Sequence, residues 1–112
     1  MNTITYRYVN FAWGQEEHLK VSIDLKKKTT NVIKDMGDPL EDKLSESDIK
    51  EIFEFFKQRK FVVRSDISFD APMYSLFVDN SLVADGVLSD KTDYQYMDIK
   101  EFIDRYTPAI IS

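Results

Sequence analysis

The sequence contains no cysteine among its 112 residues. Disulfides, thiol catalysis and zinc sites built on thiolates are therefore excluded. Glycine and proline occur only three times each, and Gly14, Gly37 and Gly86 are too far apart to form a phosphate-binding loop. No run approaches the roughly 18 apolar residues of a membrane span, and the opening MNTITYRY lacks the apolar core of a signal peptide. We therefore expect a cytoplasmic protein that does not bind membranes.

Groups that could carry catalysis are also scarce. His18 is the only histidine, and it lies beside Glu16 and Glu17 at the start of a predicted strand, where an ordinary surface histidine is expected. No Gly-x-Ser-x-Gly nucleophile motif occurs. The acidic run at 35–42 lacks the spacing of an EF-hand, because Gly37 comes too early. We expect no enzyme activity, no cofactor and no metal site, and a hydrolase that uses only carboxylates is the catalytic alternative.

The chain does have enough apolar residues for one core, since 43% are hydrophobic and 13% aromatic. We therefore expect a single globular domain over residues 1–112. Alternating apolar and polar residues predict strands with one buried face, most clearly over Leu19–Leu25. The other expected extended segments are 4–8, 29–33, 61–63, 73–78 and 81–84. Asp79 and Asn80 tolerate left-handed backbone and predict a tight turn between the last two.

Two helices are predicted, the first of them after a polar loop over Asp35–Ser47. Ser45 and Asp48 resemble a capping box, and apolar residues follow at helical spacing. The apolar stripe of the first helix consists of Ile49, Ile52, Phe53 and Phe56. The second helix is expected over Tyr96–Tyr106, and Pro108 stops it. Its stripe consists of Ile99, Phe102, Ile103 and Tyr106.

These elements predict an α+β fold, in which an antiparallel sheet of four to six strands has two helices packed on one face. An internal echo suggests a further level of organisation. Asp48-Ile49-Lys50-Glu51 recurs as Asp98-Ile99-Lys100-Glu101, 50 residues later. Each copy follows a predicted hairpin and a polar loop. A ββα–ββα pseudo-repeat is one explanation, and chance recurrence of residues that are common at helix starts is the other.

Charge is unevenly distributed along this chain of net charge −5. Residues 35–48 include six acids and one lysine, and residues 64–98 include seven acids and two cations, whereas residues 20–34 carry five lysines and one acid. The balance argues against direct nucleic-acid binding. Acid interleaved with aromatic residues is typical of a surface that binds a basic protein, although solubility alone also explains an acidic surface. The expected contact residues are Asp66, Asp70, Asp79, Asp85, Asp90, Asp93, Tyr94 and Tyr96.

In layout and character the chain resembles bacterial immunity proteins, which neutralise toxins of contact-dependent growth-inhibition and polymorphic-toxin systems. The resemblance rests on a small, acidic, cysteine-free α+β domain without a catalytic set, and on the order of five segments. These are Tyr6-Arg7-Tyr8, Leu19–Leu25, Ser45–Phe56, Tyr74–Asp79 and Asp98–Tyr106. The resemblance implies a one-to-one complex with a cognate toxin, often a basic nuclease, whose active site or a nearby surface is blocked. The lysines of residues 20–34 depart from a uniformly acidic inhibitor.

A second hypothesis is a non-catalytic domain that binds a small molecule or serves as a structural accessory. Its cleft would be lined by Tyr6, Tyr8, Trp13 and Phe77, although a packed core also accounts for these aromatic residues. Within the first hypothesis, spaced carboxylates could imitate the phosphates of a nucleic acid in a nuclease groove.

Overall fold

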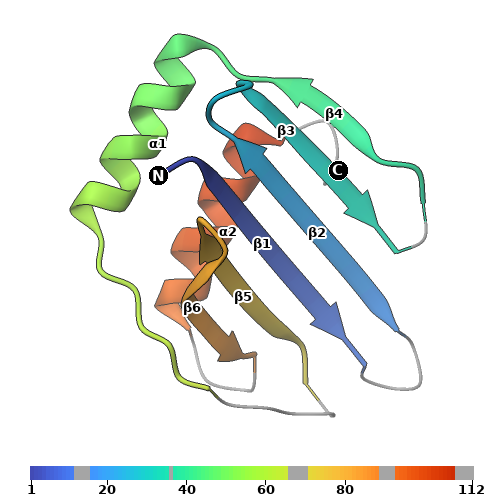
Figure 1. The fold of residues 1–112 in the computed structure, drawn as a ribbon. Helices are drawn as coiled ribbons and strands as arrows, with labels where there is room; N and C mark the ends of the chain where they lie inside the picture. The colour runs from blue at the N-terminus through green and yellow to red at the C-terminus, as the bar shows by residue number, and fades with distance from the viewer. Residues whose placement is uncertain (12–15, 36, 66–70, 89–92, 108–112) are drawn as a thin grey trace.

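The computed structural model describes residues 1–11, 16–35, 37–65, 71–88 and 93–107. Those ranges contain six strands and two helices (Figure 1). The strands are β1 (Thr3–Asn10), β2 (Glu17–Asp24), β3 (Thr29–Lys34), β4 (Leu40–Lys43), β5 (Met73–Val78) and β6 (Ser81–Val87). The helices are α1 (Glu46–Gln58) and α2 (Tyr94–Tyr106). The predicted α+β class is confirmed, with the sheet at the upper end of the expected four to six strands.

The six strands form one antiparallel sheet in the order β4-β3-β2-β1-β5-β6. The first four strands form a meander, and the β5–β6 hairpin adds to the free side of β1. Between them the chain passes through α1, and α2 follows β6 and lies behind the sheet (Figure 1). The strand at each edge is therefore the end of a hairpin, and the two earliest strands lie in the middle. Within the described residues, neither helix is long and apolar enough to span a membrane.

The core lies between the sheet and the helices and follows the predicted alternation. Val21 and Ile23 of β2 are buried, whereas Lys20 on the same strand is exposed. Ile4 and Tyr6 of β1 are paired in register with Ile23 and Val21 and join the same core. A shift of one residue would move all of these side chains to the other face, so burial specifies the register.

The start of α1 agrees with the sequence, but one position of its apolar stripe was wrongly predicted. Ser45 Oγ accepts a hydrogen bond from Asp48 N at 3.0 Å, and Asp48 Oδ2 accepts one from Ser45 N at 2.9 Å. This is the expected capping box. Phe53 is 45% exposed, and Phe55 is half-buried instead. The reason is that α1 packs against α2 as well as the sheet, which turns its apolar contact toward Phe55.

The loop expected over Asp35–Ser47 contains a strand. β4 forms at Leu40–Lys43, and all four of its residues are exposed. This strand therefore lacks the alternation of buried and exposed residues by which a strand is recognised in a sequence. It is held by backbone pairing with β3 at the edge of the sheet, a contact that depends on a distant neighbour rather than on local pattern.

Two boundaries in the second half also differ from expectation. β6 continues to Val87, whereas it was expected to end at Ala84. α2 begins two residues earlier than predicted, at Tyr94, because the Asp93 side chain accepts a hydrogen bond from Tyr96 N and caps the helix. The tight turn at Asp79-Asn80 is confirmed by positive φ at both residues.

The internal echo does not mark equivalent positions in the two helices. Asp48 is the third residue of α1, whereas Asp98 is the fifth residue of α2. Among the described residues, four strands precede α1 and two lie between α1 and α2. The two quartets therefore occupy different turns, on helices that follow unequal numbers of strands.

Candidate functional site

The predicted contact residues do not form one continuous acidic surface in the described part of the chain. Asp66, Asp70 and Asp90 lie outside the described residues. Asp79 lies in the β5–β6 turn, whereas Asp85 lies toward the far end of β6 and Asp93 precedes α2. Each of these three described carboxylates also accepts hydrogen bonds from its own chain.

Asp79 joins the N-terminal end of β1 to the β5–β6 turn. Its Oδ1 accepts hydrogen bonds from Thr3 N at 2.9 Å and from Asn2 N at 2.7 Å, and its Oδ2 lies 3.6 Å from the amino group of Met1. The two backbone hydrogen bonds, first that from Thr3, hold the pKa of the Asp79 carboxyl below its usual value. Asp79 therefore has a structural role in the hairpin.

Asp85 holds the segment that follows α1 against the edge of the sheet. Its Oδ1 accepts hydrogen bonds from Arg64 N at 2.6 Å and from Ser65 N at 3.1 Å. Gln95 of α2 extends this attachment, since its side chain accepts from Val62 N at 2.7 Å and donates to Val62 O at 3.1 Å. The residues after Phe61, expected to be extended, thus connect α2 to β6.

Asp93 contacts the segment that follows α1, and its side chain is mostly buried, at 10% exposed. Its Oδ2 accepts hydrogen bonds from Arg64 Nη1 at 2.8 Å and from the Tyr74 hydroxyl at 2.9 Å. Gly86 lies opposite Tyr74 on the neighbouring strand, and its lack of a side chain leaves room for the guanidinium and the phenol. The cluster of Arg64, Tyr74 and Asp93 therefore stabilises the fold.

The two predicted contact tyrosines differ in exposure. Tyr94 is 75% exposed on the first turn of α2. Tyr96 is half-buried, and its ring lies 5.1 Å from the ring of Tyr74 and packs on the core. Of the described residues that the sequence indicated, Tyr94 and Asp79 are exposed, and the Asp79 carboxylate already accepts hydrogen bonds from Asn2 and Thr3.

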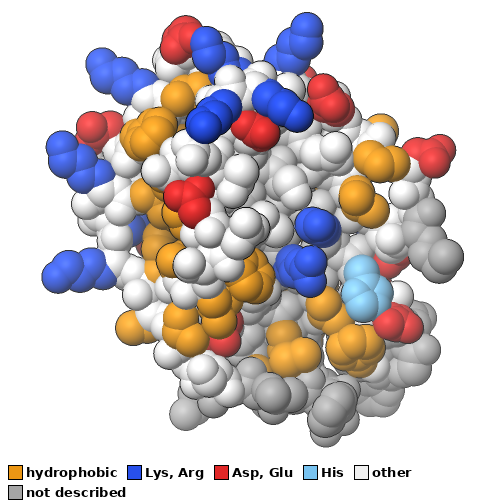
Figure 2. Space-filling view, viewed as in Figure 1, with side chains coloured by type: hydrophobic (Ala, Val, Ile, Leu, Met, Phe, Trp, Pro, Cys, Tyr) orange, Lys and Arg blue, Asp and Glu red, His pale blue; other side chains and the backbone are white. Residues whose placement is uncertain are grey.

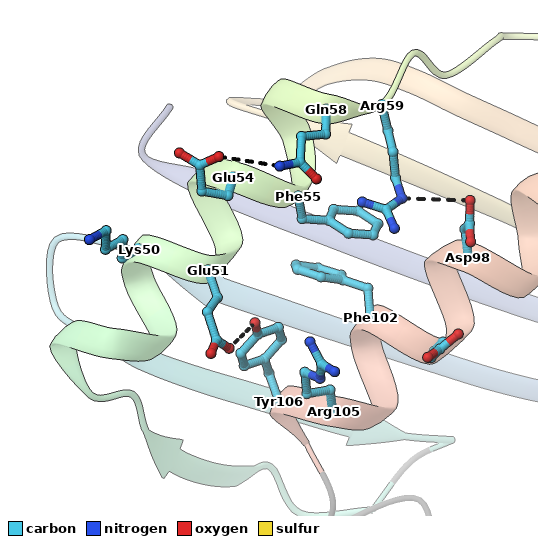
Figure 3. A pocket seen from close by; sticks show the side chains of 11 residues that line it. Lys50, Glu51, Glu54, Phe55, Gln58, Arg59, Asp98, Phe102, Arg105 and Tyr106 are labelled. Atoms are coloured by element: carbon cyan, nitrogen blue, oxygen red, sulfur yellow. Dashed lines mark hydrogen bonds and ion pairs between the residues drawn. The ribbon is translucent and has the colours of Figure 1, made fainter.

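A groove of about 460 Å³ between α1 and α2 offers a different surface (Figure 3). The helices run antiparallel, and contacts between α1 with its C-cap Arg59 and α2 recur along the groove. Among them are Glu51 with Tyr106, Phe55 with Phe102, and Arg59 with Asp98. Moving four residues forward from Glu51 to Phe55 corresponds to moving four residues backward from Tyr106 to Phe102. The contacts therefore recur about once per helical turn.

Aromatic rings form the floor of the groove. Phe55 and Phe102 are stacked, with ring centroids 4.3 Å apart and an interplanar angle of 19°. Phe56 meets Phe102 edge to face at 5.6 Å. The guanidinium of Arg59 lies 4.3 Å from the centre of the Phe55 ring, which is a cation–π contact. The groove therefore has an apolar base, and one guanidinium already lies on it.

Charged side chains surround this aromatic floor. The acids are Glu51, Glu54, Asp98 and Glu101, and the bases are Lys50, Arg59 and Arg105. The Tyr106 hydroxyl donates a hydrogen bond to Glu51 Oε2 at 2.9 Å. Burial and this carboxylate raise the pKa of Tyr106 to about 12. An apolar centre within a polar, charged rim is the usual anatomy of a protein-binding surface.

Sequence reasoning missed the groove because the contact residues were chosen by local charge. The available signal was the spacing of four residues that relates Glu51, Phe55 and Arg59. A matching spacing relates Asp98, Phe102 and Tyr106. Neither set of residues shows by itself which element it contacts. The pairing of the two helices could therefore be seen only in the tertiary structure.

The cleft expected for a small molecule is divided in the structure. Tyr6 and Tyr8 line a hollow of about 170 Å³ beside α2, together with Tyr96. Phe77 lies on the opposite face of the sheet, and Trp13 lies outside the described residues. Burial raises the pKa of Tyr6 above its usual value. Ligand pockets commonly measure about 300–1,000 Å³, so this hollow is small for a metabolite.

The described ranges contain no group of three or more His, Asp or Glu side chains placed to hold a metal ion. His18 is exposed, and its Nε2 lies 2.6 Å from Glu16 Oε1. Comparisons of the chain with protein-family models, with curated proteins and with solved structures found no match.

Proposed function

We propose that this protein is an immunity protein that binds and neutralises a bacterial toxin through the groove between α1 and α2. The observation that carries the proposal is the composition of the groove, a stacked aromatic floor within a charged rim. The exposed side of α2 extends this surface. Tyr94 and Met97, 75% and 55% exposed, share one helical stripe with Asp98 and Glu101 of the rim.

The chemistry of the groove suits a basic partner. The carboxylates of Glu54 and Glu101 are exposed in the rim, and the chain as a whole has a net charge of −5. Acidic charge accelerates encounter with a basic protein and sets its orientation. A guanidinium of the toxin would take the place of Arg59 over the Phe55 ring, whose other face is stacked on Phe102.

Within this proposal, large exposed side chains at the end of the groove supply the affinity. Tyrosine is among the residues that most often dominate binding energy at protein interfaces. Tyr94 and Met97 would be covered by the toxin, and the charged rim would surround the contact. Inhibition then follows from covering the active site of the toxin or a surface beside it, and it needs no reaction by this chain.

The experiment uses the product of the neighbouring upstream gene as the candidate toxin. Binding is measured by isothermal titration calorimetry, and protection is measured as growth of cells that express the toxin. We expect Tyr94→Ala and Glu101→Lys each to weaken binding about tenfold or more, by analogy with interface hot spots. Asp38→Lys makes the same charge change at an exposed position between β3 and β4 and serves as the matched control.

The outcomes separate the two parts of the proposal. Absence of both a complex and growth protection overturns the assignment as an immunity protein. If a complex forms but Tyr94→Ala and Glu101→Lys bind as tightly as Asp38→Lys, the groove is not the contact surface.

A further inference from the structure

The face of the sheet opposite the helices carries two cations side by side. Arg7 of β1 and Lys20 of β2 are directly opposite each other in the antiparallel register, and both are exposed. Figure 2 views this face, and Lys and Arg side chains lie near its middle, apart from the acidic side chains. This surface is separate from the groove between α1 and α2, so an inference from it does not rest on the function proposed above.

Neither of these two cations is neutralised by an ion pair within the described part of the chain. Like charges directly opposite on neighbouring strands destabilise a sheet. No described carboxylate forms an ion pair with Arg7 or Lys20. Their other neighbours in register are Ser75 and Ile33, which carry no charge. A bound anion would remove the repulsion between the two cations.

A hollow of about 310 Å³ lies on each side of the two cations, and Arg7 and Lys20 line both. The first is completed by Thr5, Ser22, Phe77 and Asn80. The second is completed by Tyr8, Val9, His18, Leu19, Ile33 and Asp35. Asp35 Oδ1 accepts a hydrogen bond from His18 N at 2.8 Å, so this carboxylate is engaged at the margin. The surface thus has a cationic centre with an apolar side chain on either side, Phe77 in one hollow and Ile33 in the other.

We propose that this face binds an acidic segment of a protein partner. One carboxylate of the segment lies between Arg7 and Lys20, and apolar side chains before and after it enter the two hollows against Phe77 and Ile33. The charge count favours a protein segment over a nucleic acid. Two cations neutralise few phosphates, so they supply little of the affinity that a nucleic acid requires.

The test uses the full chain and a fluorescein-labelled synthetic peptide in which one glutamate is flanked by leucines. Binding is followed by fluorescence anisotropy at low and physiological salt. We expect saturable binding that weakens with salt, and a loss of about tenfold or more for Arg7→Gln and for Lys20→Gln. Lys34→Gln makes the same charge change on β3, next to Leu19 in the adjoining strand, and should bind as the native chain does.

A second measurement keeps the test independent of misfolding. Because Arg7→Gln removes a like-charge contact, its unfolding midpoint should equal or exceed that of the native chain. Equal binding of a peptide with glutamine in place of glutamate overturns the proposal. It is also overturned if no binding occurs at millimolar peptide, or if single-stranded RNA or inorganic phosphate binds more tightly than the peptide.

Discussion

Arg64 Nη1 lies 2.8 Å from Asp93 Oδ2, and this ion pair connects the segment after α1 to the start of α2. The same guanidinium nitrogen donates to the Tyr74 hydroxyl at 3.0 Å. The other oxygen of Asp93 accepts from Tyr96 N and caps α2. One carboxylate thus joins three parts of the chain, and its two oxygens have separable roles.

Replacing Asp93 by alanine and by asparagine should separate these roles. Asp93→Ala removes both cap and ion pair and should lower the free energy of unfolding by about 1–3 kcal/mol. Asp93→Asn keeps an oxygen that can cap the helix, so its cost should be smaller. Urea denaturation followed by circular dichroism measures both. Equal losses for the two variants would show that the cap contributes nothing.

Gly86 should not tolerate alanine. A Cβ at this position would lie 2.8 Å from Tyr74 Cε1 and 2.9 Å from Arg64 Nη1. Tyr74 is 2% exposed and has no room to move away, so we expect Gly86→Ala to cost about 1–3 kcal/mol through overpacking. Ser81→Ala, at an exposed position of the same strand, is the control. Unfolding midpoints in urea that agree for both variants would contradict this account.

Thr30 should be replaceable by valine with a gain in stability. Thr30 is fully buried, and its Oγ1 has no hydrogen-bond partner in the described part of the chain. Thr30→Val removes this buried hydroxyl at constant shape and should raise the free energy of unfolding by about 1 kcal/mol.

Thr107 provides the matched control for Thr30. It is also fully buried, but its Oγ1 donates a hydrogen bond to Ile103 O at 2.6 Å. Thr107→Val leaves that interaction unmade and should destabilise the protein by about 1 kcal/mol. Thermal and urea unfolding of both variants check the opposite signs, and a loss of stability in Thr30→Val would refute the prediction.

Stability should decline at alkaline pH in part through Tyr106. Burial and Glu51 raise the pKa of Tyr106 from 10 to about 12, so the folded state holds the phenolic proton more tightly than the unfolded state. This contribution is complete below pH 10 and is lost as the pH rises through about 12. Tyr106→Phe should therefore lose less stability than the native chain between these values. Urea unfolding of Tyr106→Phe and of the native chain at several pH values measures this difference. An equal decline in the free energy of unfolding of both proteins would contradict the prediction.

The predicted pH dependence also has a component that should persist in Tyr106→Phe. Burial raises the pKa values of Tyr6, Tyr8 and Tyr74 as well. Tyr94→Phe, at a position three-quarters exposed, should follow the native decline and is the control.

At neutral pH, Tyr106→Phe should lower the free energy of unfolding by about 0.5–1.5 kcal/mol because the hydrogen bond to Glu51 is lost.

The sequence by itself determined the elements that depend on near neighbours. Alternation in β2 identified Val21 and Ile23 as buried, because successive side chains of a strand point to opposite faces. Ser45 and Asp48 marked the start of α1 because capping needs only residues three apart. The turn at Asp79-Asn80 followed from the backbone preferences of the two residues that form it.

Only the tertiary structure decided which elements meet. The exposed strand β4 exists through its pairing with β3, and Phe55 rather than Phe53 faces inward because α2 lies beside α1. The antiparallel match of Phe55 with Phe102, which forms the groove, joins residues far apart in the chain. Local periodicity indicates which side of an element is apolar, but the neighbour that covers this side is selected by the packing of the whole domain.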